Sequence, residues 1–123
     1  MNFEMFVSSI HNAAPVGFVF KNPGGGISEI MKTSDIKITY RRGKSKITIS
    51  FDNLFKAYSS FQGQRVTSSD LKKFLPSIFD SQERPAGHSC NSTFFFTLLQ
   101  HIGVSGNIMG NGKRGDPFFV QIK

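Results

Sequence analysis

The spacing of apolar residues changes at Ser50, and this change limits the fold more than any other feature of the sequence. Before Ser50, apolar and polar residues alternate over residues 36–40 and 47–51, on either side of the segment Arg-Arg-Gly-Lys-Ser. Alternation with a period of two is typical of a half-buried strand, so these residues predict a β-hairpin with a basic tip. After Ser50 the apolar residues recur at intervals of three and four, which predicts helices. The two patterns together predict an α+β fold.

Four helices are predicted from the spacing of apolar residues, over residues 3–13, 50–61, 67–79 and 91–102. Thr67 and Asp70 have the spacing of a capping box at the start of the third helix, and Pro76 should kink that helix. Short apolar runs on both sides of the Gly- and Asn-rich segment 110–116 predict two further strands. At 123 residues the chain is expected to form a single domain with its own hydrophobic core.

The elements after the hairpin follow a recognisable order. A helix is followed by a short strand at residues 65–67, two helices, and two strands joined by a basic turn. This order resembles the winged helix-turn-helix family, although the 11-residue connection between the last two helices is longer than the family's usual turn. The resemblance implies a winged-helix core over residues 50–123, with helix 91–102 as the recognition helix and residues 106–123 as the wing. Residues 1–49, a helix and a basic β-hairpin, are then an extension that packs against this core.

The chain has a net charge of +7, from 15 Lys and Arg residues against 8 Asp and Glu residues. The excess of positive charge is spread over both halves of the sequence, so it belongs to the whole domain. Such a field favours a polyanionic partner. Together with the resemblance, it leads us to expect a non-catalytic module that binds double-stranded DNA. Such a module could be a regulator or the DNA-recognition domain of a larger, restriction-type protein.

In this interpretation the helix over residues 91–102 enters the major groove. Phe95, Leu98 and the apolar residues in register with them would face the core, while the polar side chains would face outward. Asn91 or Ser92 would cap the helix at an exposed N-terminus. Asn and Gln can pair with adenine, and Ser or Thr with several base edges. The predicted base contacts are His88, Asn91, Ser92, Thr93, Thr97 and Gln100.

Basic residues on the predicted loops would hold the DNA backbone, unless these loops are merely solvated turns. Four of them lie together at the hairpin tip, and two lie at the tip of the wing. Cations on loops beside a recognition helix can grip phosphates and position the helix without reading sequence. The predicted phosphate contacts are Arg41, Arg42, Lys44, Lys46, Arg65, Arg84, Lys113 and Arg114.

A protein-interaction module is the main alternative function. In that case Phe94, Phe96 or Phe118 would be exposed and would bind another protein, and the positive charge would be incidental. Phe94 and Phe96 could instead complete the core beneath the wing. Salt dependence separates the two functions, because an aromatic protein interface responds little to salt whereas phosphate contacts respond strongly.

A metal-dependent nuclease is a weaker alternative. Asp35 and Lys37 form an acid-x-lysine triplet of the kind found in such enzymes, but Glu29 is the only nearby upstream acid. Lys37 also falls on the solvent side of an alternating strand. His88, Cys90 and His101 are too few and too irregularly spaced to indicate a metal site. We therefore expect no catalytic activity, no metal and no cofactor.

The sequence also bears on where the protein acts. No apolar run approaches the length of a membrane span, and the first residues lack the features of a secretory signal. Cys90 is the only cysteine, which excludes an internal disulfide and suits a reducing compartment. We expect a cytoplasmic or nucleoid-associated protein with no membrane contact.

Overall fold

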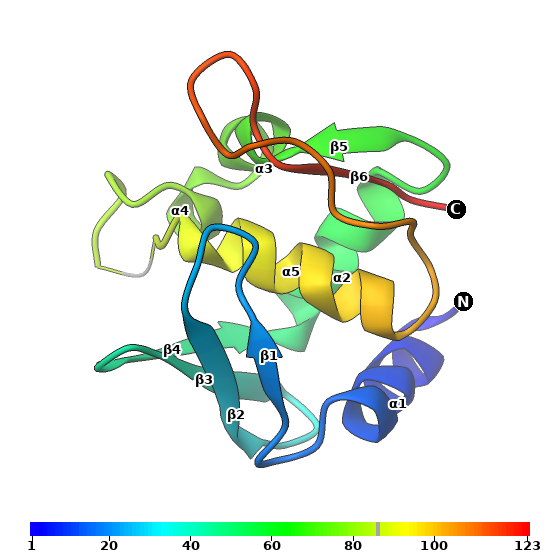
Figure 1. Cartoon of the computed structure of the whole chain (residues 1–123). Helices are drawn as coiled ribbons and strands as arrows, with labels where there is room; N and C mark the ends of the chain where they lie inside the picture. The colour runs from blue at the N-terminus through cyan, green and yellow to red at the C-terminus, as the bar shows by residue number, and fades with distance from the viewer. Residues whose placement is uncertain (86) are drawn as a thin grey trace.

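A computed structural model describes residues 1–85 and 87–123 and places helix α5 (Cys90–His101) at the centre of the protein (Figure 1). A four-stranded sheet lies on one side of α5, and helix α1 (Phe3–Ala13) packs near the C-terminal end of α5. Helix α2 (Phe51–Ser60) lies behind α5, and a two-stranded sheet with helix α3 (Ser68–Phe74) covers the top. The fold is α+β, as the change of spacing at Ser50 predicted.

The four-stranded sheet is antiparallel throughout and has the strand order β1-β2-β3-β4. Its strands are β1 (Val19–Lys21), β2 (Ile27–Thr33), β3 (Lys37–Arg42) and β4 (Ser45–Ser50). Strands β3 and β4 are the predicted hairpin, and Ile38 and Tyr40 point to the core from it. Alternation did not predict β2, because a bulge between Ile30 and Lys32 interrupts its pairing with β3. The predicted hairpin is therefore half of a larger sheet.

The predicted helix starts are confirmed where a side chain caps the helix. The Ser50 hydroxyl accepts a hydrogen bond from the amide of Asn53 at the start of α2, 3.1 Å away. Thr67 and Asp70 form the predicted capping box at the start of α3, in which each side chain accepts a hydrogen bond from the other residue's amide. Such caps replace partners that the first turn of a helix lacks, so they fix where each helix begins.

Pro76 has a stronger effect than the predicted kink. The helix expected over residues 67–79 is split at Leu75 into α3 and the short helix α4 (Pro76–Phe79). Proline has no amide hydrogen and its ring disfavours helical geometry in the residue before it, so it is best accommodated in the first turn of a helix. Pro76 accordingly starts α4.

The core is one cluster of buried apolar side chains, and both residues 1–49 and residues 50–123 contribute to it. It is rich in phenylalanine, and burial of each such side chain contributes about 1.5–3 kcal/mol. The rings of Tyr40 and Phe94 are stacked with their centroids 3.8 Å apart, which joins the four-stranded sheet to α5. The fully buried phenylalanines are Phe6, Phe51, Phe79, Phe94, Phe95 and Phe96.

The small sheet pairs strand β5 (Arg65–Thr67) with strand β6 (Phe119–Gln121). Of the two strands predicted around the wing, only β6 forms, although Met109 pairs with Phe119 through two backbone hydrogen bonds of 2.9 Å. The loop between them turns at Gly112, which has a φ of +69°, and a Cβ there would lie 2.2 Å from the Phe118 ring. The segment 110–118, here called the wing loop, is therefore tightly packed within itself, with the Phe118 ring against Gly112.

Among the residues that the structure describes, none of the helices is both long enough and apolar enough to cross a membrane.

Candidate anion-binding site

The polar residues in the first turns of α5 are buried, so their predicted role as base contacts is wrong. Asn91 and Ser92 are each 1% exposed, and Thr97 is 4% exposed. The Thr97 hydroxyl donates a hydrogen bond to the carbonyl of Thr93, one turn earlier in the same helix. The predicted cap is also two or three residues too late, because Ser89 occupies the N-cap position. Side chains without solvent access cannot reach base edges in a groove.

Asn91 instead connects two distant parts of the core. Its Oδ1 accepts a hydrogen bond from the Tyr40 hydroxyl at 2.7 Å, and its Nδ2 donates to the carbonyl of Ile78 at 2.9 Å. The first bond reaches β3 and the second reaches α4. Asn91 is therefore a structural residue that ties α5 to both neighbours.

The four-stranded sheet covers one side of α5 along its first turns. Tyr40 and Phe20 stack on Phe94 from the sheet side, with centroid distances of 3.8 and 5.9 Å. The N-terminal residues thus cover the side of α5 that a recognition helix would present to DNA. Phe94 and Phe96 are part of the core, as expected if they complete it, and this removes two of the three residues of the predicted protein-interaction patch.

The other predicted base contacts do not form one surface. Thr93 is half-buried, and its hydroxyl donates to the carbonyl of Cys90 at 3.2 Å. Gln100 is exposed but lies near the C-terminal end of α5, about 15 Å along the helix from its first residue, Cys90, at 1.5 Å per residue. His88 is half-buried in the loop before α5. These positions cannot contact one short stretch of bases together.

The four predicted cations of the hairpin are divided between the two faces of the sheet. Arg41 and Lys46 are paired across β3 and β4 on the outer face, where Arg41 also forms a 2.9 Å ion pair with Glu29. Lys44 is exposed in the turn. Arg42 lies on the inner face, and its Nη1 donates to the Thr93 hydroxyl at 3.4 Å. Arg42 is therefore the hairpin cation that faces the start of α5.

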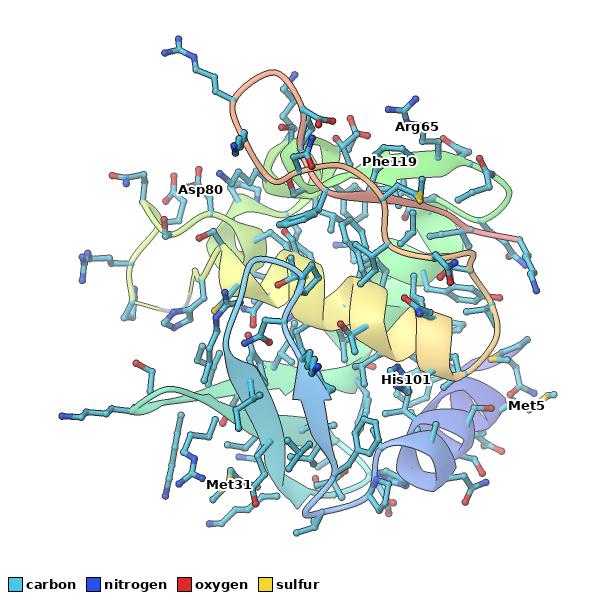
Figure 2. All side chains as sticks on the ribbon, in the orientation of Figure 1. Met5, Met31, Arg65, Asp80, His101 and Phe119 are labelled. Atoms are coloured by element: carbon cyan, nitrogen blue, oxygen red, sulfur yellow. The ribbon has the colours of Figure 1, made fainter. Side chains whose placement is uncertain are left out.

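Two of the remaining predicted cations also lie away from α5. Arg65 stacks over the ring of Phe119, 3.9 Å from its centroid, at the end of the small sheet away from the wing loop (Figure 2). Arg84 is exposed in the loop before α5. The predicted cluster of eight phosphate contacts is thus dispersed over several faces, and only part of it converges.

The part that converges lines a hollow of about 490 Å³, here called the basic hollow. It is lined by residues from the start of α3, the start of α5, the wing loop and the end of β3. Its four cations come from three separate parts of the fold, namely β3, α3 and the wing loop. They are Arg42, Lys72, Lys113 and Arg114. No Asp or Glu is among the described residues that line it, so positive charge predominates in its lining.

Hydroxyl groups line the basic hollow between these cations. The start of α5 contributes most of them, and its N-terminal end carries the positive end of the helix dipole. The Ser89 side chain makes no capping hydrogen bond. The hydroxyl residues are Ser68, Ser69, Ser89, Ser92 and Thr93. Cations, hydroxyl donors and a helix N-terminus together are the chemistry that binds phosphate groups.

Lys72 is the cation that the sequence analysis missed. It lies on the exposed side of α3, beside the buried Leu71. Lys72 shares a predicted helix with Asp70 and Lys73, and such a charged residue is expected to face solvent without a specific partner. The basic character of that short helix was visible in the sequence, but its proximity to Lys113 and Arg114 depends on the path of the wing loop.

The Tyr40 hydroxyl lies beside the basic hollow but is enclosed. Besides its bond to Asn91, it lies 3.3 Å from the Cys90 sulfur. Burial raises the pKa of this hydroxyl well above its ordinary range, and the neighbouring Cys90 adds to the shift. The neutral phenol is therefore the form that the folded protein requires.

We expect the contribution of Tyr40 to stability to decrease at high pH. In the unfolded chain a phenol ionises near pH 10, whereas in the folded protein it stays neutral, so this stability is complete below about pH 10 and is lost above it. The measurement is the free energy of urea unfolding of wild type and Tyr40→Phe at about pH 8 and pH 11. The difference between the two proteins should shrink by about 1 kcal/mol at the higher pH. A difference that does not change with pH would contradict this assignment.

A metal-dependent active site has no support in the residues that the structure describes. Nowhere among them do three His, Cys, Asp or Glu side chains gather closely enough to hold a metal ion. Glu29 is engaged with Arg41, and Asp35 lies in the exposed turn between β2 and β3. The acid-x-lysine triplet therefore lacks the additional carboxylates that a magnesium site needs.

Comparisons with protein-family models, with curated proteins and with solved structures found no match for this chain. The resemblance to winged-helix proteins therefore rests on the order of elements in residues 50–123.

Proposed function

We propose that the protein binds double-stranded DNA through its phosphate backbone and does so without catalysis. The observation that carries this proposal is the basic hollow, where Arg42, Lys72, Lys113 and Arg114 converge with no carboxylate among the lining residues described. Phosphate contacts provide most of the affinity of proteins that bind DNA without reading its sequence. The net charge of +7 adds a long-range attraction to any polyanion.

In this proposal the protein holds the backbone and does not read bases with α5. The helix offers its N-terminal end to a phosphate, because the sides of its first turns are covered by the core. The wing loop then acts as the wing of the proposed winged-helix arrangement, and its Lys113 and Arg114 grip a phosphate. Such a module could serve as a regulator or as the DNA-binding part of a larger protein.

We expect the affinity for duplex DNA to fall steeply with salt. Four phosphate contacts should give a slope of about −3.6 in a plot of log affinity against log salt, at 0.9 for each contact. Unrelated duplex sequences should bind alike, because base contacts are absent from this mechanism. The measurement is fluorescence anisotropy of labelled duplexes over a range of salt concentrations.

The same titration separates this proposal from a protein-interaction module. A slope near zero, or no measurable binding at low salt, would contradict DNA binding. A sharp preference for one sequence would also contradict it, since that preference would require base contacts.

A further inference from the structure

The hydroxyl of Ser92 is buried in the wall of the basic hollow and lacks a hydrogen-bond partner. Ser92 is 1% exposed, and its Oγ contacts no donor or acceptor in the described part of the chain. A buried polar group without a partner destabilises a fold, so native proteins seldom keep one without a reason. Alanine would fill nearly the same space at this position. The hydroxyl is therefore better explained by a bound ligand than by folding.

The surroundings of Ser92 specify an anion as that ligand. Ser92 is the third residue of α5, within the turn where the positive end of the helix dipole acts. Cys90 and Thr93 line the hollow beside it, and Arg42, Lys72, Lys113 and Arg114 surround the same space. The lining residues described contribute four positive charges and no negative ones. A group with more than one negative charge is matched best by such a set.

The depth of Ser92 distinguishes between the phosphates of a DNA molecule. An internal phosphate of a duplex is flanked on both sides by sugars, which limit how closely it can approach a side chain that is buried in the wall of the hollow. A terminal phosphate projects from the end of the strand and can enter first. It also carries close to two negative charges at neutral pH, whereas an internal phosphate carries one.

We propose that the basic hollow binds the terminal phosphate of a DNA strand, with the Ser92 hydroxyl as a donor to a phosphate oxygen. The cations of the hollow hold this phosphate together with the internal phosphates next to it in the strand. This inference rests on the proposed DNA binding and makes it specific for DNA ends.

The test compares duplexes that differ only at their ends. One duplex carries a phosphate at its 5′ ends, a second carries it at its 3′ ends, a third has hydroxyl groups at all ends, and a fourth is a closed dumbbell without ends. We expect at least one phosphorylated duplex to bind about tenfold more tightly than the hydroxyl-ended duplex and the dumbbell, measured by anisotropy at one salt concentration. Inorganic phosphate should compete with the phosphorylated duplex.

Ser92→Ala isolates the role of the hydroxyl. The variant should fold with an equal or higher urea midpoint, because it removes an unpartnered polar group, and it should reduce the preference for phosphorylated ends to less than about threefold. Lys113→Ala, at an exposed position in the wing loop, provides a second variant that should reduce the same preference. Gln100→Ala, at the far end of α5, is the matched control and should keep it.

The outcomes separate this inference from the proposed function. Equal binding of all four duplexes would overturn the terminal-phosphate site and leave backbone binding intact. Binding of inorganic phosphate without binding of any duplex would overturn the proposed function and retain the anion site. A preference for phosphorylated ends that survives both Ser92→Ala and Lys113→Ala would place the phosphate elsewhere and overturn the inference.

Discussion

Replacing Asn91 with alanine should lower the free energy of unfolding by about 2–4 kcal/mol, because two buried polar groups lose their partner and a cavity opens. The groups are the hydroxyl of Tyr40 and the carbonyl of Ile78, which Asn91 bridges at 2.7 and 2.9 Å. For a protein of ordinary stability this loss is a large share of the total. The measurement is urea unfolding followed by circular dichroism, with the midpoint expected to fall while the slope stays constant.

Gln100→Ala is the control for this prediction. Gln100 is an exposed polar residue of the same helix, so its replacement should change stability by less than about 0.5 kcal/mol. The two variants also distinguish a structural role of Asn91 in α5 from a role in contacting bases. If Asn91 contacted bases, Asn91→Ala would retain full stability and lose DNA affinity. That result would contradict the structural role assigned to Asn91.

Removing three cations from the basic hollow should weaken duplex binding by on the order of a hundredfold at moderate salt. The variant is Lys72→Ala combined with Lys113→Ala and Arg114→Ala, all exposed positions whose replacement leaves the core untouched. Each lost phosphate contact should also reduce the steepness of the salt dependence by about 0.9. The triple variant should therefore show a slope of about −1 in the salt titration.

A charge-matched control makes this result specific to the hollow. Lys44→Ala, Lys46→Ala and Arg84→Ala together remove the same charge from exposed positions outside the hollow. This variant should lose only the long-range part of the attraction, a few-fold in affinity. Equal losses in the two triple variants would mean that net charge alone drives binding, and that the hollow has no particular role.

Local patterns predicted those elements whose signals lie close together in the sequence. The β3–β4 hairpin follows from strict alternation and a basic turn, and the start of α3 follows from the spacing of Thr67 and Asp70. The start of α2 follows from the change of period at Ser50. Each of these depends on residues within about one turn or one strand of each other, which is the range over which propensity and capping act.

The burial of α5 was not predicted, although the sequence contained a signal for it. Phe94, Phe95 and Phe96 are consecutive, so they cannot all lie on one apolar stripe of a helix. A helix that is apolar around its circumference is typical of the centre of a fold. Only Phe95 and the apolar residues in register with it were expected in the core, so Asn91 and Ser92 were expected on the exposed side. This error led to the predicted base contacts.

The basic hollow could be predicted only in part. Lys113 and Arg114 stood out as the tip of a loop, and Arg42 belonged to an evident basic cluster. Which hairpin cation faces inward depends on the register of β3, in which Arg42 shares the side of Ile38 and Tyr40. Lys72 joins them because α3 and the wing loop line the same hollow. Such convergence of three separate parts of the chain arises from tertiary structure and leaves no local pattern.

The most direct test of the account is to map the amide chemical shifts of the isotope-labelled protein during titration with a short phosphorylated duplex. The account predicts that the largest changes occur at residues lining the basic hollow, including Ser69, Cys90 and Gly112. It predicts little change on the outer face of the sheet, at Thr39 and Thr48. Changes concentrated on that outer face, with the hollow unaffected, would contradict the proposal that the basic hollow binds phosphate.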